Sequence, residues 1–273
     1  MTVSTKAFVG NTISVRRSEN MVISHKHKYL FIEIPHTAST AIHKELCDNY
    51  DGSPILRKHA LYSEFQKIAS PEEKTYFVFA GMRNPLDDAV TLYYKYKTNH
   101  KERYTDPKRL AQGRGNVTRD DMRRFSFIAE NDADFATYFR KLYKSPYCNV
   151  MLSLASKHCD FIMRFENLQD DFSKAIGLIG TEQKRPLPRI NWTGEKKDDY
   201  LSCYTPEIIE QVKRVFGPCM KRWGYDFPPE WGDNSISWLS QIEFHTALIV
   251  KSLYWNYLRK SPRLYGRLIR QVR

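Results

Sequence analysis

The sequence predicts an α/β fold: a central parallel sheet flanked by helices, with a helical extension at the C-terminus. Short β-prone apolar runs alternate with amphipathic helical stretches, which is typical of parallel strands joined by crossover helices. The 273 residues are 41% hydrophobic and 27% charged, enough apolar material for a sizeable core. From residue 236 the chain changes character and becomes an aromatic helix with a basic tail. We therefore expect a domain over 1–235, with its core motifs at 29–228, and an extension over 236–273.

The first strand–turn–helix unit follows a polar start. Residues 1–28 contain no long apolar run and predict a loose segment. The run YLFIEI (29–34) is apolar and β-prone and ends at Pro35, so we expect a buried strand there. The stretch STAIHKELCD then predicts a helix, with Ser39 or Thr40 as its N-cap.

A second unit of the same kind begins at TYFVFAG (75–81), which predicts another strand. The helix after it is expected to begin at Pro85, with Asn84 as its N-cap. Residues 98–124 are polar and contain two glycines and a proline, which predicts a long loop. Eight Lys/Arg against four acids give residues 101–124 a net charge of +4.

The remaining core elements continue the alternation of helices and strands. We expect a helix over 125–143, a strand over 159–165, a helix over 166–180, and a helix over 206–223 with an interruption at Gly217-Pro218.

The charge balance favours an anionic partner. Lys and Arg number 43 against 31 acids, a net charge of +12. Residues 258–273 carry six positive charges and no acid, so the tail supplies half of this excess. No nucleic-acid recognition motif is present, and we expect no nucleic-acid partner. The tail's apolar residues suit an interfacial helix with weak peripheral membrane contact, and a solvated or packed terminal helix is the alternative.

The cysteines and the N-terminus favour a cytoplasmic protein. Five scattered cysteines include no CxxC pair, so they predict reduced thiols rather than a zinc site or redox motif. The N-terminus lacks the apolar core of a signal peptide, and no run of about 18 apolar residues occurs. There is no HExxH motif and no Cys/His cluster, so we expect no metal.

The turn after the first strand has the composition of an anion site. It reads Pro-His-Thr-Ala-Ser-Thr over 35–40. Backbone amides at a helix N-terminus attract phosphate or sulfate, and Thr37, Ser39 and Thr40 can add hydroxyl donors. Ordinary helix capping would give a similar turn. The Walker ending GK[ST] is absent, which disfavours a nucleoside-triphosphate hydrolase or a kinase-like enzyme.

The second unit offers a further phosphate site. Arg83 lies between the strand end and the helix, and Thr91 follows eight residues later, about two turns into the helix. An Arg at the carboxyl end of a strand points toward the usual ligand crevice of an open α/β sheet. A guanidinium with a hydroxyl suits phosphate. A surface Arg and an ordinary helical Thr are the alternative.

Together these residues resemble the sulfotransferase family that uses 3′-phosphoadenosine 5′-phosphosulfate (PAPS), and most closely its carbohydrate and bacterial branch. The 35–40 turn is similar to that family's PKTxxT loop, and Arg83-Asn84-Pro85 with Thr91 to its second motif. Further similar segments are KHALYSEF (58–65), DFIMRFENLQDDF (160–172), LPRIN (187–191) and YTPEIIEQV…WGYDFP (204–228). The resemblance covers roughly 20–228 and implies a P-loop-like sulfotransferase fold.

The resemblance also implies roles for the two turns. The 5′-phosphosulfate would bind at His36, Thr37, Ala38, Ser39, Thr40 and Ala41, and the 3′-phosphate at Arg83 and Thr91. His36 stands where the family usually has Lys, whose charge assists the leaving phosphate. His36 can supply that charge as an imidazolium, and Lys196 and Lys197 are candidate substitutes.

The acceptor side is implied less fully. His59, in the KHA segment, corresponds to the carbohydrate branch's catalytic His and would take the proton of the acceptor hydroxyl. Glu166 would contact the acceptor or orient a loop, and capping of the next helix is its alternative role. The expected reaction is sulfuryl transfer from PAPS to a hydroxyl, first of a carbohydrate and otherwise of a small hydroxylated metabolite. The remaining alternative for the function is a catalytically impaired homologue that binds the nucleotide.

Overall fold

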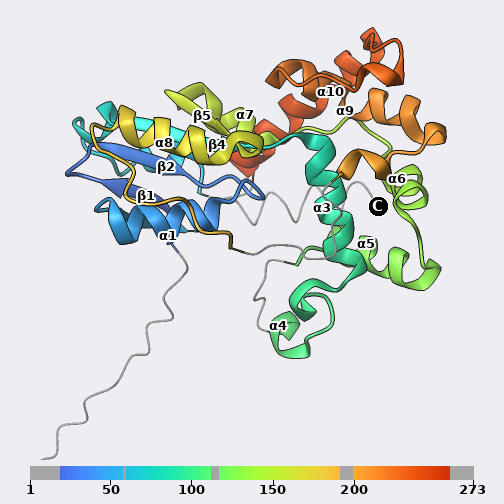
Figure 1. The fold of residues 1–273 in the computed structure, drawn as a ribbon, viewed down its shortest axis with the longest axis horizontal. Coiled ribbons are helices and arrows are strands. Elements are labelled where there is room, and N and C mark those ends of the chain that lie inside the picture. Colours follow the sequence, from blue (N-terminus) through green and yellow to red (C-terminus); the bar gives the residue numbers. More distant parts are fainter. Residues whose placement is uncertain (1–18, 58–59, 112–116, 191–198, 259–273) are drawn as a thin grey trace, which may run out of the picture.

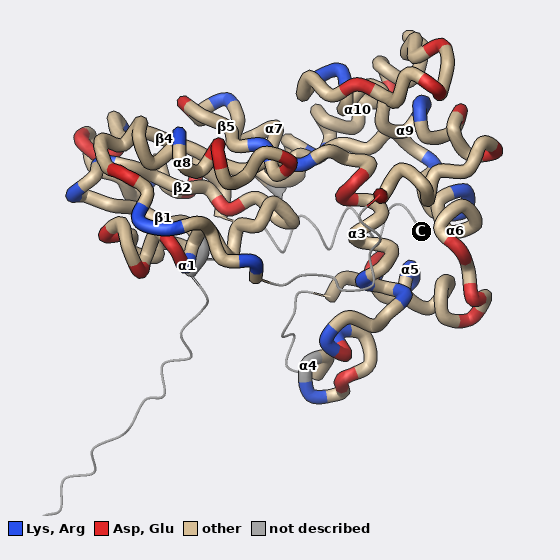
Figure 2. Tube along the Cα trace, viewed as in Figure 1, with Lys and Arg blue, Asp and Glu red and all other residues tan. Residues whose placement is uncertain are grey.

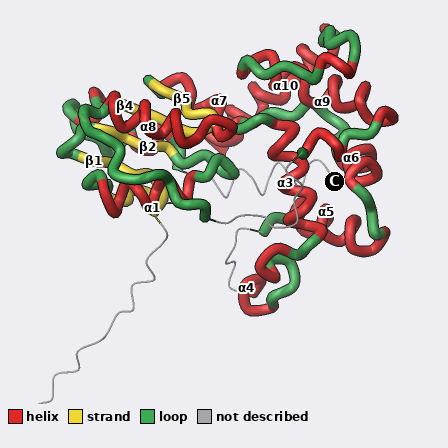
Figure 3. The backbone as a smooth tube through the Cα atoms, in the orientation of Figure 1, coloured by secondary structure: helices red, strands yellow, loops and turns green. Residues whose placement is uncertain are grey.

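The computed structural model describes residues 19–57, 60–111, 117–190 and 199–258. The sheet and the helices that cover it lie at one end of the molecule, and a second group of helices lies at the other (Figure 1; Figure 3). Helix α3 (Pro85–Lys97) leaves the sheet end directly after a strand and runs into the helical group. The two expected phosphate-binding turns belong to the sheet end.

The described strands form a five-stranded sheet in the order β3-β1-β2-β4-β5. The central neighbours β2, β4 and β5 run parallel, whereas β1 pairs antiparallel with both β2 and β3. The predicted α/β fold is therefore confirmed, with a parallel core inside a mixed sheet. The strands are β1 (Glu19–Ser24), β2 (Tyr29–Ile32), β3 (Ser53–Arg57), β4 (Phe77–Met82) and β5 (Phe161–Arg164).

Helices cover both faces of this sheet. On one face α1 and α8 pack against Tyr29 and Phe31, and on the other α2 and α7 pack against Leu30 and Ile32. All four β2 side chains are at most 1% exposed, which explains the unbroken apolar run in the sequence. The covering helices are α1 (Ser39–Asn49), α2 (Tyr62–Phe65), α7 (Val150–Ala155) and α8 (Leu168–Leu178).

A second core, rich in aromatic side chains, holds the helical group together. Tyr93 of α3, Phe135, Tyr138 and Phe139 of α6, and Phe216 of α9 pack within it. Its helices besides α3 are α5 (Arg119–Asn131), α6 (Phe135–Leu142) and α9 (Ile209–Trp223); α4 (Pro107–Ala111) precedes α5, and α10 (Trp238–Leu253) packs on α9 and α7.

Short helical turns complete the described chain. The 3₁₀ turns are η1 (Glu73–Thr75), η2 (His100–Glu102), η3 (Ser156–His158), η4 (Phe165–Asn167), η5 (Tyr200–Cys203), η6 (Pro206–Ile208) and η7 (Pro229–Trp231), and a π-helical turn η8 (Tyr254–Leu258) follows α10.

The loose start expected over 1–28 is wrong over Glu19–Ser24, which form β1. Met21, Val22 and Ile23 are at most 2% exposed because β1 lies inside the sheet and has helices on both faces. A strand buried on both faces shows no polar–apolar alternation, and three apolar residues between polar neighbours are a weak signal. Residues 1–18 lie outside the described part.

The long loop expected over 98–124 is also wrong, because helix α4 and the start of α5 lie within it. Thr118 begins α5: its hydroxyl accepts from Asp121 N at 3.0 Å, and its own amide donates to the Asp121 carboxylate at 2.8 Å. This is a capping box. The helix expected over 125–143 is divided at Asp132, whose φ of 42° ends α5 before Asp134 caps α6.

Two other helix expectations have different outcomes. Asn84 caps α3 as predicted, accepting from Leu86 N at 2.9 Å, with Pro85 at the first helical position. The interruption expected at Gly217-Pro218 is absent, since α9 continues through Pro218. Within the described residues, no helix is long and apolar enough to cross a membrane.

Candidate functional site

The turn between β2 and α1 leaves a helix N-terminus without a side-chain cap. His36 and Ala38 have left-handed backbone conformations, with φ angles of 67° and 58°. Ala38 is the N-cap, so the predicted caps Ser39 and Thr40 are wrong: both lie in the first turn of α1. Alanine has no side-chain oxygen to offer the first amides of α1, and Ala38 makes no side-chain cap bond. The arrangement leaves these amides able to donate to an anion.

Thr37 fastens this turn to the neighbouring strand. Its side chain is 2% exposed, and its hydroxyl donates to the Ile34 carbonyl at 2.9 Å. A Cβ on Gly81 of β4 would lie 2.7 Å from Thr37 Oγ1, so this close approach requires glycine. The Thr37 hydroxyl therefore supports the turn, and Ser39 and Thr40 are the more exposed hydroxyls beside it.

Arg83 and Thr91 lie together, as their spacing predicted. Arg83 Nη2 donates to Thr91 Oγ1 at 2.8 Å, and Nη1 donates to the His36 carbonyl at 3.2 Å. Its Nε donates to Asp87 at 2.6 Å, and the guanidinium lies 4.0 Å from the centre of the Phe165 ring. These three bonds use three of the five N–H donors of a guanidinium. Arg83 thus joins the two turns and keeps two donors for a ligand.

His36 faces a buried carboxylate. Its Nδ1 lies 2.9 Å from Asp88 Oδ1, at ion-pair distance, and Asp88 is 8% exposed. Burial raises the pKa of Asp88, but the charges of His36 and Arg83 outweigh it and hold that pKa below its usual range. A buried carboxylate therefore lies beside Nδ1, and Nε2 is the other nitrogen of the imidazole.

Lys95 is a residue that the sequence interpretation missed. It follows Asp88 by two helical turns on the same face of α3 and is half-buried. Burial lowers its pKa, Asp88 opposes this shift, and Arg83 adds to it. Burial and the charge of Lys95 also lower the pKa of His100. The seven-residue spacing from Asp88 to Lys95, two helical turns, could have shown from the sequence that Lys95 lies on the same face of α3 as Asp88.

Further positive charge lies beyond Lys95. Lys101 and Arg103 both contribute to the lowered pKa of Lys95. Lys and Arg recur along the chain around α4 and the start of α5 (Figure 2). This end of α3 therefore presents a positive environment to an anionic ligand.

Glu166 lies beside the Arg83 turn but is engaged with its own chain. Asn84 N donates to Glu166 Oε1 at 2.6 Å, and the Tyr225 hydroxyl donates to Oε2 at 2.9 Å. The carboxylate thereby links the chain after β5 to the start of α3. This favours the loop-orienting role of Glu166 over acceptor contact.

Three of the expected site residues, His59, Lys196 and Lys197, lie outside the described residues. The described groups that could hold a ligand are the 36–41 turn, Arg83 with Thr91, and Lys95. No cluster of three His, Cys, Asp or Glu that could hold a metal ion occurs within the described chain.

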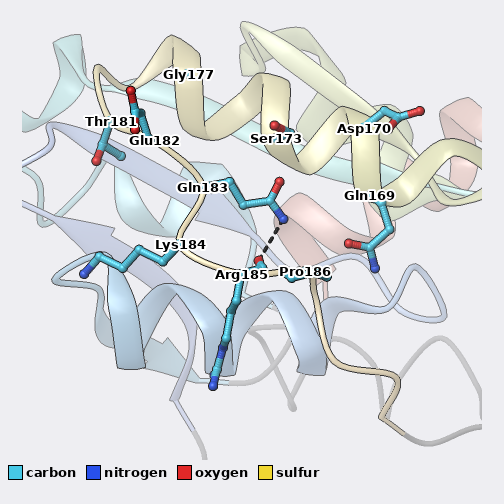
Figure 4. Close-up of a pocket in the computed structure, with 10 residues that line it drawn as sticks. All are labelled: Gln169, Asp170, Ser173, Gly177, Thr181, Glu182, Gln183, Lys184, Arg185 and Pro186. Atoms are coloured by element: carbon cyan, nitrogen blue, oxygen red, sulfur yellow. Dashed lines mark hydrogen bonds between the residues drawn. The ribbon is translucent and has the colours of Figure 1, made fainter.

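A cavity of about 770 Å³ lies elsewhere, between α8 and the segment 181–186 (Figure 4). Its lining is polar and includes Gln169, Ser173 and Arg185, and Gln183 Nε2 donates to the Arg185 carbonyl at 2.9 Å. None of the described residues expected to bind PAPS lines it. The two turns therefore remain the candidate site.

Comparison with known families agrees with this geometry. The model of the sulfotransferase family matches residues 19–226, which is more than half of the chain and spans both turns. The chain belongs to the sulfotransferase family. No match was found among curated proteins or among solved structures.

Proposed function

We propose that this protein transfers the sulfuryl group of PAPS to a hydroxyl of an acceptor, first of all a carbohydrate. Sulfuryl transfer in general follows from the family. The observation that carries the donor assignment is the Arg83 guanidinium, which bonds Thr91 in one unit and the His36 carbonyl in the other. A donor with phosphates at both the 5′ and 3′ positions would engage both units at once.

The described residues suit such a donor. The α1 N-terminus, without a side-chain cap, would hold the 5′-phosphosulfate through its amides and the Ser39 and Thr40 hydroxyls. Arg83 and Thr91 would hold the 3′-phosphate, because two guanidinium donors are left by the bonds described above. When bound, PAPS supplies an activated sulfuryl group with a phosphate leaving group.

His36 and Lys95 are the proposed cations at the leaving phosphate. Asp88 lies beside His36 Nδ1, and Nε2 of a protonated imidazole would donate to a developing phosphate charge. Lys95, on the same face of α3 as Asp88, would add a second positive charge. Together they would replace the single lysine that sulfotransferases usually carry in this turn. Lys196 and Lys197 remain candidates for the same role.

On the acceptor side we assign the general base to His59, whose neutral imidazole would take the proton of the attacking hydroxyl. Glu166 would act as a positioning residue through Asn84. A basic environment near Lys95, Lys101 and Arg103 supports an acceptor that carries negative charge, as many glycans do. A small hydroxylated metabolite is the second acceptor class.

The cysteines support a cytoplasmic location. All five are free thiols, two of them buried, as expected for a chain kept in a reducing compartment. The tail would add a weak contact with anionic surfaces through its six positive charges.

The test compares three nucleotides by calorimetry and is followed by sulfate transfer. Adenosine 3′,5′-bisphosphate should bind at least tenfold more tightly than AMP or ATP, because a charge-assisted contact to a phosphate contributes about 1.5–3 kcal/mol. Labelled sulfate should then pass from PAPS to one member of a panel of hydroxylated acceptors. Equal affinity for all three nucleotides would contradict the donor assignment. Tight binding with no transfer to any acceptor would identify an impaired homologue.

A further inference from the structure

One helix exposes an unusual number of large apolar side chains. On α10 and the turn after it, seven such residues are each more than half exposed, and we call them the apolar face of α10: Trp238, Leu239, Ile242, Ile249, Val250, Leu253 and Tyr257. The described chain has only four other exposed large hydrophobic residues, Ile68, Leu110, Leu178 and Ile190. Exposed apolar residues are ordinary when single, but a contiguous group marks a binding surface.

These seven residues form one stripe. At about 100° per residue, Trp238, Ile242, Ile249 and Leu253 fall within roughly 60° of arc, and the other three lie beside them. With a rise of about 1.5 Å per residue, the stripe is roughly 30 Å long. Its aromatic members, Trp238 and Tyr257, lie at its two ends.

The protein's own packing uses the opposite side of this helix. Ser240 and Phe244 are each 2% exposed, and Phe244 packs with Cys148, Val150 and Cys219 from α7, α9 and their surroundings. Figure 1 shows α10 at the edge of the helical group, beside α9. The apolar face is thus the side that the described fold leaves uncovered.

Charge indicates what covers this face. Residues 259–273 follow the helical turn directly and carry six Lys/Arg and no acid, whereas α10 itself contains one acid, Glu243. A second copy of this chain has the same positive excess and offers these residues no complementary charge. An anionic surface would attract them, which makes it the complementary partner.

We propose that the apolar face of α10 docks this protein onto an anionic lipid bilayer, toward which the positive charge of the following residues attracts it. Apolar side chains insert at the boundary of the acyl chains, and the basic residues meet the anionic headgroups. Trp238 and Tyr257 suit the headgroup level, where aromatic side chains are enriched. Two such contributions together are what stable peripheral attachment needs. The proposal is independent of sulfuryl transfer.

The experiment is co-sedimentation of the full chain with vesicles of phosphatidylcholine alone or mixed equally with phosphatidylglycerol. The wild type should bind the anionic vesicles and lose binding at high salt. The triple variant Ile242→Ser/Ile249→Ser/Leu253→Ser should bind roughly tenfold more weakly or worse. The matched control Ile68→Ser/Leu178→Ser removes two equally exposed apolar residues elsewhere and should behave as the wild type.

Folding of each variant is checked by circular dichroism and by its thermal response to adenosine 3′,5′-bisphosphate. If the triple variant does not fold, the emission of Trp238 decides: anionic vesicles should shift wild-type fluorescence to the blue, and Trp238→Phe should remove most of this shift. Absence of vesicle binding, or equal binding by wild type and folded triple variant, overturns the proposal. A dimer that the triple variant abolishes, with no vesicle binding, assigns the face to a second copy instead.

Discussion

The two strand–turn–helix units share a topology but prepare their helix N-termini in opposite ways. In the first unit the N-cap Ala38 offers no side-chain acceptor, and no acid occurs in the first turn of α1. The second ends β4 with the Asn84 cap and places Asp87 and Asp88 in the first turn of α3. The start of α3 thus carries its own negative charge, whereas the start of α1 carries none, which would suit an external anion.

The same contrast appears in how each unit would bind phosphate. The first offers backbone amides, which carry no net charge and cannot be removed by substitution. In the second unit the Asn84 side chain already accepts from Leu86 N, so a phosphate there would be held by a side chain, Arg83. Single substitutions should therefore change nucleotide binding at one of the two turns without changing it at the other.

The largest effect is expected for Arg83→Ala, which should abolish the preference for a 3′-phosphate. The variant loses the guanidinium that bonds Thr91, so affinity for adenosine 3′,5′-bisphosphate should fall roughly 10- to 150-fold, while AMP affinity changes little. Calorimetry with both nucleotides measures this. Arg140→Ala, which removes a half-exposed arginine of α6, should leave both affinities unchanged. An equal loss of affinity for both nucleotides would show that Arg83 does not recognise the 3′-phosphate specifically.

The contact between the units should be broken by Gly81→Ala. The new Cβ would lie 2.7 Å from Thr37 Oγ1 and 3.3 Å from the Thr37 carbonyl, so the β2–α1 turn must shift. We expect a loss of about 1–3 kcal/mol in the free energy of unfolding, with weaker nucleotide binding. Urea unfolding measures the first quantity. Gly177→Ala, within α8 and with nothing inside 4 Å of its Cβ, should instead gain up to about 1 kcal/mol.

The sequence predicted this contrast only in part. The Asn84 cap and the contact between Arg83 and Thr91 could be predicted, because capping and helical spacing depend on residues close in the sequence. Ala38 could not be recognised as the N-cap, since its methyl side chain has no capping atom and the sequence does not mark its left-handed backbone conformation. The more polar residue beside it was the natural but wrong choice.

Tertiary burial explains the other differences. β1 was predicted to be part of a loose polar segment because its short apolar run has no alternating pattern. Its burial comes from helices that cover both faces of the strand in the folded chain. Lys95 was missed because its burial and the nearby charge of Arg103, which both lower its pKa, arise only in the folded chain. The Thr118 capping box, by contrast, was present in the sequence and would have located α5.

Each unit has an ion pair between the end of its strand and its helix, and the two pairs should affect the pH dependence of stability differently. In the first unit His43 Nδ1 lies 2.5 Å from buried Glu33 Oε1; hydrogen bonds to Cys47 and then to Glu33 raise the pKa of His43 from 6.5 to about 10. The protonated form stabilises the fold, fully so below pH 6.5, and this contribution is lost as the pH rises to about 10. The corresponding ion pair of the second unit, Arg83 with Asp87, contains no histidine.

We therefore expect the wild type to lose about 1 kcal/mol or more of unfolding free energy between pH 6.5 and pH 10 through this pair. Urea unfolding at both pH values measures it. His43→Gln should remove this part of the pH dependence, so that the difference between the two proteins narrows as the pH rises. A constant difference across the window would mean that His43 does not change charge there.

The smallest effect on stability is the sharpest test of the open helix N-terminus. Thr40→Glu places an exposed acid in the first turn of α1, which now has none. A carboxylate near a helix N-terminus typically contributes about 0.3–1 kcal/mol, so the free energy of unfolding should rise. The same carboxylate occupies the position proposed for the 5′-phosphosulfate, so binding of both AMP and adenosine 3′,5′-bisphosphate should fall together. Thr137→Glu, exposed in the first turn of α6, should give a similar gain without changing nucleotide affinity. If Thr40→Glu stabilises the fold and nucleotides still bind as before, the anion site is not at α1; if it lowers stability, the amides of α1 are already satisfied.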